Sequence, residues 1–270
     1  MIFLTAAIVA ASLAAHCNPA PGESLLWANS QTRYVIIGEV HGTAQTPALF
    51  ADLACAAHMS GRPVVVGIEI SATAQPALDT FLASDGGVAA RARFLASPIW
   101  HFPFKDGRSS RAYLQLIERL RRLKRAGLIQ GVRAIQPSDT AASDTQNQAN
   151  AAMADRIRAA GSGDPRTLVL VLVGNFHARK RASVFETETI VTAAADLPQR
   201  QTLSLSVTTT GEAWNCVSAS ATSCGPHAQP EGRPIPRGVT LSPTAGGDYD
   251  GFIGLGVPAT ASPPAVVGGS

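Results

Sequence analysis

The chain has 270 residues, of which 46% are hydrophobic and 15% charged, with a formal net charge of +3. This composition can bury the core of one large α/β domain. Much of the positive charge lies in short clusters such as residues 119–125, whose leucines recur at helical spacing. We therefore expect these arginines on the solvated face of an amphipathic helix, which argues against a nucleic-acid partner.

The N-terminus is apolar through Ala15 but too short to span a bilayer comfortably, and small residues surround Leu13. Residues 1–15 therefore predict an export signal, and with it a periplasmic location. No Lys or Arg follows Met1, and an uncleaved interfacial anchor, which would bring the protein near a membrane, has a similar pattern. A lipid on Cys17 is disfavoured because His16 stands where lipoprotein signals need a small residue.

Apolar runs that suit strands alternate with helical patterns along the chain, which is typical of βαβ units. We expect strands at residues 33–37, 64–70, 131–135, 168–173 and 202–207. We expect helices at residues 46–60, 74–84, 109–126, 144–160 and 178–195. The predicted fold is a single α/β domain over residues 16–257, in which helices flank a largely parallel central sheet.

Proline, glycine and small residues dominate the chain after Gly225. We expect a loop at 226–246, one further strand within 248–256 and a flexible tail at 258–270. In an oxidising compartment, Cys216 and Cys224 are close enough in sequence to form a disulfide, although two free thiols are the alternative. Cys55 lies in an apolar helical stretch and is interpreted as a small core residue.

Two strand ends carry the same pattern of glycine, polar residue, apolar residue and histidine. The first is Gly38-Glu39-Val40-His41 and the second is Gly174-Asn175-Phe176-His177. Alternation along an extended chain places the polar residue and the histidine of each motif on one side. In parallel α/β sheets the crevice beyond the carboxyl ends of the strands binds ligands, so both motifs are expected there. The glycines remove side-chain bulk where the backbone bends or approaches a ligand.

Glu69 lies within the otherwise apolar strand 64–70, where an unpaired carboxylate would be costly to bury. It therefore needs a partner. Each polar residue taken alone has a structural explanation, but the repeated motif favours a shared site of Glu39, His41, Glu69 and His177.

These motifs and the glutamate between them resemble the pattern of the erythromycin esterase, ChaN and TraB/Tiki superfamily. The resemblance spans residues 34–177, and the ending YDGFIGLGVPATASPPA is similar to that of ChaN-type bacterial members. It implies an α/β scaffold with the site at the strand ends. The activities it implies are diverse, because the superfamily includes esterases, metal-dependent proteases and haem-binding lipoproteins.

Two hydrolytic chemistries fit these residues. In the first, His41, Glu69 and His177 hold a divalent metal and Glu39 is the base that activates water. In the second, a histidine activated by a carboxylate removes a proton from water without a metal. Either would hydrolyse an ester, a lactone or a peptide bond in a small-molecule or peptide substrate. The alternative is haem binding without catalysis, although Tyr34, Tyr113 and Tyr249 lie in no recognisable haem motif.

The segment at 97–113 is rich in aromatic residues, which usually pack back onto the core. If the loop instead covers the strand ends, its rings would form an apolar wall that includes Trp100, and Arg108 could meet an anionic group of a substrate. Asn175, within the second motif, is a further candidate for substrate binding. We therefore expect Trp100, Arg108 and Asn175 to be the substrate-binding residues.

Overall fold

The computed structural model describes residues 17–137, 145–185, 187–218, 220–230, 233–244 and 246–266. The expected export signal at residues 1–15 therefore lies outside the described residues. In the part of the chain that is described, no helix combines the length and the hydropathy needed to cross a membrane.

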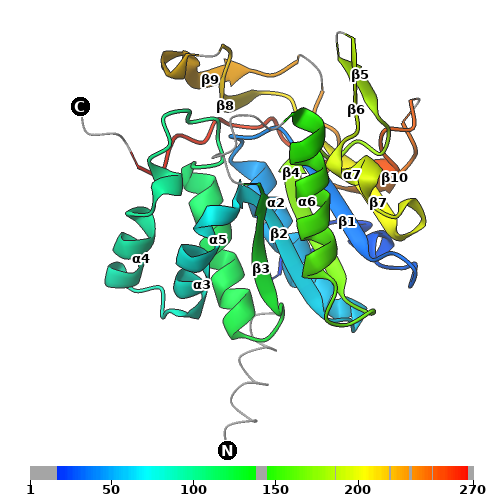
Figure 1. Ribbon diagram of the computed structural model, residues 1–270, viewed down its shortest axis with the longest axis horizontal. Coiled ribbons are helices and arrows are strands. Elements are labelled where there is room, and N and C mark those ends of the chain that lie inside the picture. Colours follow the sequence, from blue (N-terminus) through cyan, green and yellow to red (C-terminus); the bar gives the residue numbers. More distant parts are fainter. Residues whose placement is uncertain are drawn as a thin grey trace, which may run out of the picture.

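A seven-stranded sheet forms the centre of the molecule, with the strand order β10-β11-β7-β1-β4-β2-β3 (Figure 1). Neighbouring strands are parallel except for β10, which runs antiparallel to β11. The bounds of the strands are β1 (Tyr34–Glu39), β2 (Val64–Ser71), β3 (Gly131–Gln136), β4 (Leu168–Gly174), β7 (Thr202–Thr208), β10 (Gly238–Leu241) and β11 (Gly251–Gly254). The continuous apolar runs of β1, β2 and β4 follow from burial on both faces of the sheet. The predicted fold class and its five strands are confirmed.

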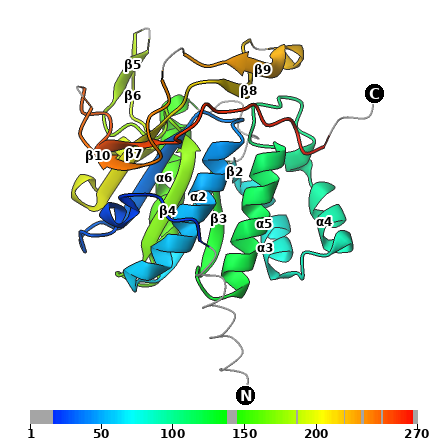
Figure 2. The same cartoon turned by 180° about the vertical axis from the view of Figure 1, so that it is seen from behind.

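Helices cover both faces of this sheet. Figure 1 shows α6 in front of the sheet, and Figure 2 shows α2 and α5 on the opposite face. The helices are α2 (Gln45–Ala56), α3 (Gln75–Ala83), α4 (Val88–Leu95), α5 (Arg111–Arg125), α6 (Gln146–Ala160) and the short α7 (Ala193–Asp196). Single 3-10 turns occur at η1 (Glu23–Leu26), η2 (Ala57–Ser60), η3 (Ala72–Ala74), η4 (Pro98–Trp100), η5 (Gln199–Gln201) and η6 (Ala221–Ser223).

Local sequence explains where the two longest helices begin. The hydroxyl of Ser110 caps α5 by accepting a hydrogen bond from the backbone of Tyr113. Thr145 and Gln148 form a reciprocal capping box at the start of α6. The apolar stripe of α5 is buried, and Arg119 of the same helix pairs with Asp52 of α2 at 2.6 Å.

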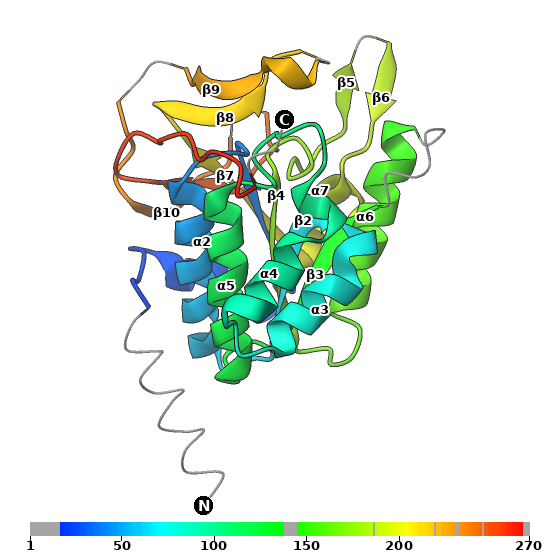
Figure 3. The same cartoon turned by 90° about the vertical axis from the view of Figure 1, so that its left-hand side faces the viewer.

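Two antiparallel hairpins rise at the end of the sheet where the site lies, and Figure 3 shows them side by side. They are β5 (Ser183–Phe185) with β6 (Glu188–Ile190), and β8 (Glu212–Cys216) with β9 (Cys224–Ala228). The helix expected at 178–195 is therefore wrong except for the short α7. The β-branched residues of 184–191 favour extended chain there. The loop expected at 226–246 is wrong in part, because β9 continues into it and β10 lies within it.

The tail expected to be flexible from residue 258 is ordered as far as residue 266. The backbone of Ser262 donates to Gly42 O at 2.8 Å, and Ala44 donates to Thr260 O at 2.9 Å. Further on, Arg111 donates to Pro263 O and Ala265 to Ser109 O, both at 2.9 Å. The proline-rich segment from residue 258 thus forms backbone hydrogen bonds that its composition does not predict.

Two disulfides are present. The predicted bond between Cys216 and Cys224 joins β8 to β9 and closes that hairpin. Cys55, interpreted as a lone core residue, instead pairs with Cys17, although its side chain is indeed buried. The packing of the N-terminal segment against α2 brings these two sulfurs together across 38 residues of sequence.

Candidate functional site

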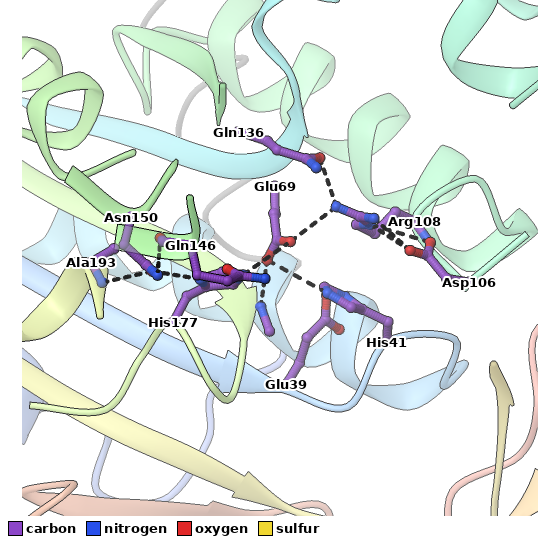
Figure 4. Close-up of polar contacts among 11 residues, drawn as sticks. Glu39, His41, Glu69, Asp106, Arg108, Gln136, Gln146, Asn150, His177 and Ala193 are labelled. Atoms are coloured by element: carbon purple, nitrogen blue, oxygen red, sulfur yellow. Dashed lines mark hydrogen bonds and ion pairs between the residues drawn. The ribbon is translucent and has the colours of Figure 1, made fainter. Parts of the chain in front are cut away.

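The main polar residues of the candidate site lie together at the carboxyl ends of three neighbouring strands. Strand β4 lies between β1 and β2, and Glu39 at the end of β1 is in register with Gly174 at the end of β4. Glu69 comes from the end of β2, and its Oε2 accepts a 2.6 Å hydrogen bond from Gly174 N. Figure 4 shows that Glu39, His41, Glu69 and His177 converge beyond the carboxyl ends of the strands.

His41 lies between two buried carboxylates. Its Nδ1 is 3.1 Å from Glu39 Oε1, and its Nε2 is 3.5 Å from Glu69 Oε2. Burial by itself would lower the pKa of His41, but the charge of Glu69 and the hydrogen bond to Glu39 outweigh it and raise the pKa to about 10. His41 is therefore an imidazolium at neutral pH, with an N–H directed at each carboxylate.

The glycines of the two motifs make this close approach possible. A Cβ atom on Gly174 would lie 2.9 Å from His41 Nε2, and one on Gly38 would lie 2.8 Å from Ala178 Cβ. Neither position has room for a side chain. Gly174 therefore leaves space for the His41 ring, and Gly38 lets the turn after β4 pack against β1.

Glu69 is the hub of the charged cluster. Besides Gly174 N and His41, it accepts a hydrogen bond from Arg108 Nη1 at 3.0 Å. Arg108 also binds Asp106 Oδ2 through Nη2 at 2.5 Å and Gln136 Oε1 through Nη1 at 2.6 Å. Burial would raise the pKa of Glu69, but the charges of His41 and Arg108 hold it well below its usual value. Glu69 is therefore ionised.

His177 has a different environment. Its Nδ1 is 2.7 Å from Asn150 Oδ1, which also accepts from Ala193 N at 3.0 Å, while Asn150 Nδ2 donates to Gln146 O at 2.8 Å. These bonds fix the orientation of the amide, so Nδ1 of His177 must carry the proton and Nε2 keeps its lone pair. Burial lowers the pKa of His177, with the charge of Glu69 acting in the opposite direction. His177 is therefore neutral at pH 7.

A cavity of 410 Å³ lies over these residues, lined by Glu39, Val40, His41, Glu69, Asp106, Arg108, Gly174, Asn175, Phe176, His177, Asn215 and Cys216. Nε2 of His177 is 3.9 Å from Glu69 Oε1, which is too far for a hydrogen bond. The His177 side chain is 22% exposed, whereas Glu39 is 1% exposed and its Oε2 has no partner among the described residues. Burial raises the pKa of Glu39, although His41 opposes that effect.

The three residues expected to bind substrate have different positions. Trp100 is fully buried, contacts Phe94 edge-on and does not line the cavity, so it packs on the core. Arg108 does reach the site, but its guanidinium is paired with Glu69 and Asp106. Asn175 is exposed and lines the cavity, while its carbonyl accepts from Tyr249 at 2.6 Å.

The expected metal ligands are a poor donor set for a divalent cation. Both nitrogens of His41 are directed at carboxylates, so coordination of a metal by either nitrogen would break its contact with Glu39 or Glu69. The guanidinium of Arg108 lies against Glu69, where it would repel a cation. Among the described residues, no group of three or more His, Cys, Asp or Glu side chains is arranged to hold a metal.

The three tyrosines, which lie in no recognisable haem motif, are likewise engaged or buried. Tyr34 and Tyr113 lie in the core, and the hydroxyl of Tyr249 donates to Asn175 O. The residues present therefore do not fit axial ligation of haem by tyrosine.

Sequence reasoning did not identify Asn150, Asp106, Gln136 or Asn215 as members of the site. Asn150 lies in the second turn of α6 at 0% exposure, and a buried asparagine on a helix facing the sheet is the signal that could have found it. Gln136 ends β3, the neighbour of β2. Nothing in the local sequence places Asn215 of the disulfide hairpin over the cavity, because this contact depends on how the hairpin folds back.

Comparisons with known proteins give structural likeness only. No family model and no curated protein matches the sequence. A variant of the erythromycin esterase EreC in its open conformation aligns with a TM-score of 0.50 and 12% identity, over 88% of this chain and 78% of that one. A structure of bacterial protein toxins gives a TM-score of 0.48 and 16% identity over 73% of this chain, which spans only 38% of that protein.

The type III effector HopBA1 aligns with a TM-score of 0.45 and 18% identity, over 76% of this chain and 93% of that one. At these identities the likeness concerns the fold and carries no activity with it. The α/β chain described above therefore has a distant fold relationship to an erythromycin esterase.

Proposed function

We propose that this protein is a hydrolase of esters or lactones that works without a metal, within the erythromycin esterase, ChaN and TraB/Tiki superfamily. The observation that supports it is the pair of histidines in two fixed and opposite protonation states within one cavity. His177 offers a lone pair at Nε2, and His41 offers a positive charge. A base beside a cation is the arrangement that attack of water on a carbonyl requires.

His177 removes a proton from a water molecule through Nε2 as the water oxygen attacks the carbonyl carbon. The negative charge that forms on the carbonyl oxygen is stabilised by the Nε2–H of His41, which is held only weakly by Glu69 at 3.5 Å. When the tetrahedral intermediate collapses, the ester bond breaks and His177 gives its proton to the departing alkoxide. The products are a carboxylic acid and an alcohol, and His177 returns to its neutral state.

The buried carboxylates have supporting roles in this scheme. Glu39 and Glu69 hold His41 protonated and orient its ring, and Arg108 balances the negative charge of Glu69. Glu39 as the base, the alternative assignment, is less suited because its free Oε2 is buried and its Oε1 is engaged with His41.

The test measures turnover of ester, lactone and peptide substrates before and after chelation, with bound metal determined on the same samples. His177→Gly should lower turnover by about 10² to 10⁴, the usual contribution of a general base, and added imidazole should restore part of it. Glu39→Gly is the matched control, which imidazole should not rescue. Activity that disappears with the metal would refute the proposal, as would a haem complex formed without any hydrolysis.

A further inference from the structure

A second cavity adjoins the catalytic one. It has a volume of 200 Å³ and lies between the end of β2, the turn η4 and the loop that leads to Arg108. Its apolar lining consists of Ile70, Pro98, Ile99, Phe102 and Phe104. This is the aromatic segment of the sequence, but with the phenylalanines, instead of Trp100, forming the wall.

The two cavities share Glu69, Asp106 and Arg108 in their linings. The two cavities therefore adjoin at these three side chains. The shared charges are already satisfied, since Arg108 contacts Glu69 at 3.0 Å and Asp106 at 2.5 Å. This shared wall is thus neutralised internally. The rest of the lining combines the apolar residues above with the uncharged Ser71, Thr73, Ser109 and Gln136.

The aromatic side chain of Phe102 is partly exposed to solvent. It is 44% exposed, although Phe104 lies beside it with the ring centroids 6.3 Å apart. A ligand group that covers these rings removes apolar surface of both partners from water, which is the main source of affinity in such a pocket.

We propose that this cavity is the specificity subsite of the enzyme, and that it takes one ring-sized apolar group beside the scissile ester. The size argument is direct: an apolar cavity of about 150 Å³ in another protein accommodates benzene. A cavity of 200 Å³ therefore has room for a phenyl or cyclohexyl group. The inference rests on the proposed hydrolysis for its catalytic part.

The kinetic test compares ethyl cyclohexylacetate with ethyl acetate, and cyclohexylmethyl acetate with ethyl acetate, each normalised to its rate of alkaline hydrolysis. The wild type should prefer a cyclohexyl substrate by at least about tenfold in kcat/KM, a discrimination that apolar pockets commonly reach. Phe102→Ala combined with Phe104→Ala should bring that ratio close to one. Thr73→Phe, which fills the cavity from its exposed rim, should do the same.

The control is Leu25→Ala, because Leu25 is 43% exposed on η1 and lines neither cavity. This variant should have the same ratio of kcat/KM for the cyclohexyl ester and ethyl acetate as the wild type. Binding of cyclohexylacetone, a ketone that cannot be hydrolysed, separates the two proposals. Binding that the phenylalanine substitutions abolish, without hydrolysis of any ester, supports the subsite and refutes the proposed function. Ester hydrolysis with no preference for a ring, or a preference that survives both sets of substitutions, refutes the subsite.

Discussion

The turns after β1 and β4 have the same sequence pattern and opposite chemistry. After β1, His41 lies between two carboxylates and is cationic. After β4, His177 faces the amide of Asn150 on α6 and is neutral. A Gly-x-x-His motif thus positions an imidazole, whereas the partner supplied by another element decides its charge.

The largest effect is expected at Glu69, which contacts both histidines and Arg108. Glu69→Gln should lower the free energy of unfolding by about 3–5 kcal/mol, because it removes the central charge of a buried cluster. Urea unfolding of both proteins measures this loss. Asp106→Asn is the control, with a smaller cost because the Asp106 side chain is 28% exposed. A loss below about 1 kcal/mol for Glu69→Gln, as at a surface ion pair, would contradict the central role of Glu69.

The two histidines should give the unfolding free energy opposite slopes with pH. The pKa of His41 is raised from 6.5 to about 10 on folding, so its contribution is complete below pH 6.5 and is lost as the pH rises to about 10. The pKa of His177 is lowered from 6.5, so its contribution is present above that pH and falls as the pH decreases through the lowered value.

Across each pH range the unfolding free energy should change by at most a few kilocalories per mole. Urea unfolding between mildly acidic and alkaline pH measures this change. His41→Gln should flatten the alkaline side, and His177→Gln should flatten the acidic side. If both substitutions changed the same side, the two motifs would not differ in charge.

The disulfide hairpin contacts the first turn, where Trp214 N donates to Gly42 O at 3.0 Å. Replacing Cys216 and Cys224 together with serine should lower the free energy of unfolding by about 2–3 kcal/mol, as expected for a short closed loop. Turnover should also fall, since Asn215 and Cys216 line the catalytic cavity. Serines at Cys17 and Cys55 form the control, which should reduce stability without altering turnover. Equal effects of the two pairs on turnover would show that the hairpin has no special role.

The smallest effect is expected at Asn150. Asn150→Asp keeps an acceptor for His177 Nδ1–H and Ala193 N, and its charge should raise the pKa of His177 by about one unit. Because neutral His177 is the proposed base, the acidic limb of the rate profile should move to higher pH by that amount. The control Gln148→Glu adds a charge at the start of the same helix and should leave the limb in place. An unchanged profile in Asn150→Asp would mean that another group controls the limb.

Sequence patterns were enough to predict the strands of the central sheet except β10, most helices and the meeting of the four polar residues. These follow from local rules: apolar runs mark buried strands, and residues that follow parallel strands gather at one edge. The proximity of Glu39 and His41 needs only their spacing of two. The pairing of Cys216 with Cys224 likewise follows from their closeness along the chain.

Tertiary structure decided what these residues do. The charge of His41 depends on Glu69 from another strand, and the tautomer of His177 depends on Asn150, 27 positions away. Trp100 is buried in the core and Phe102 is partly exposed, although both belong to one aromatic loop. The disulfide of Cys17 and the backbone hydrogen bonds of residues 258–266 likewise join segments that are far apart in the sequence. Such contacts depend on packing between distant segments, which periodicity and spacing along the chain do not encode.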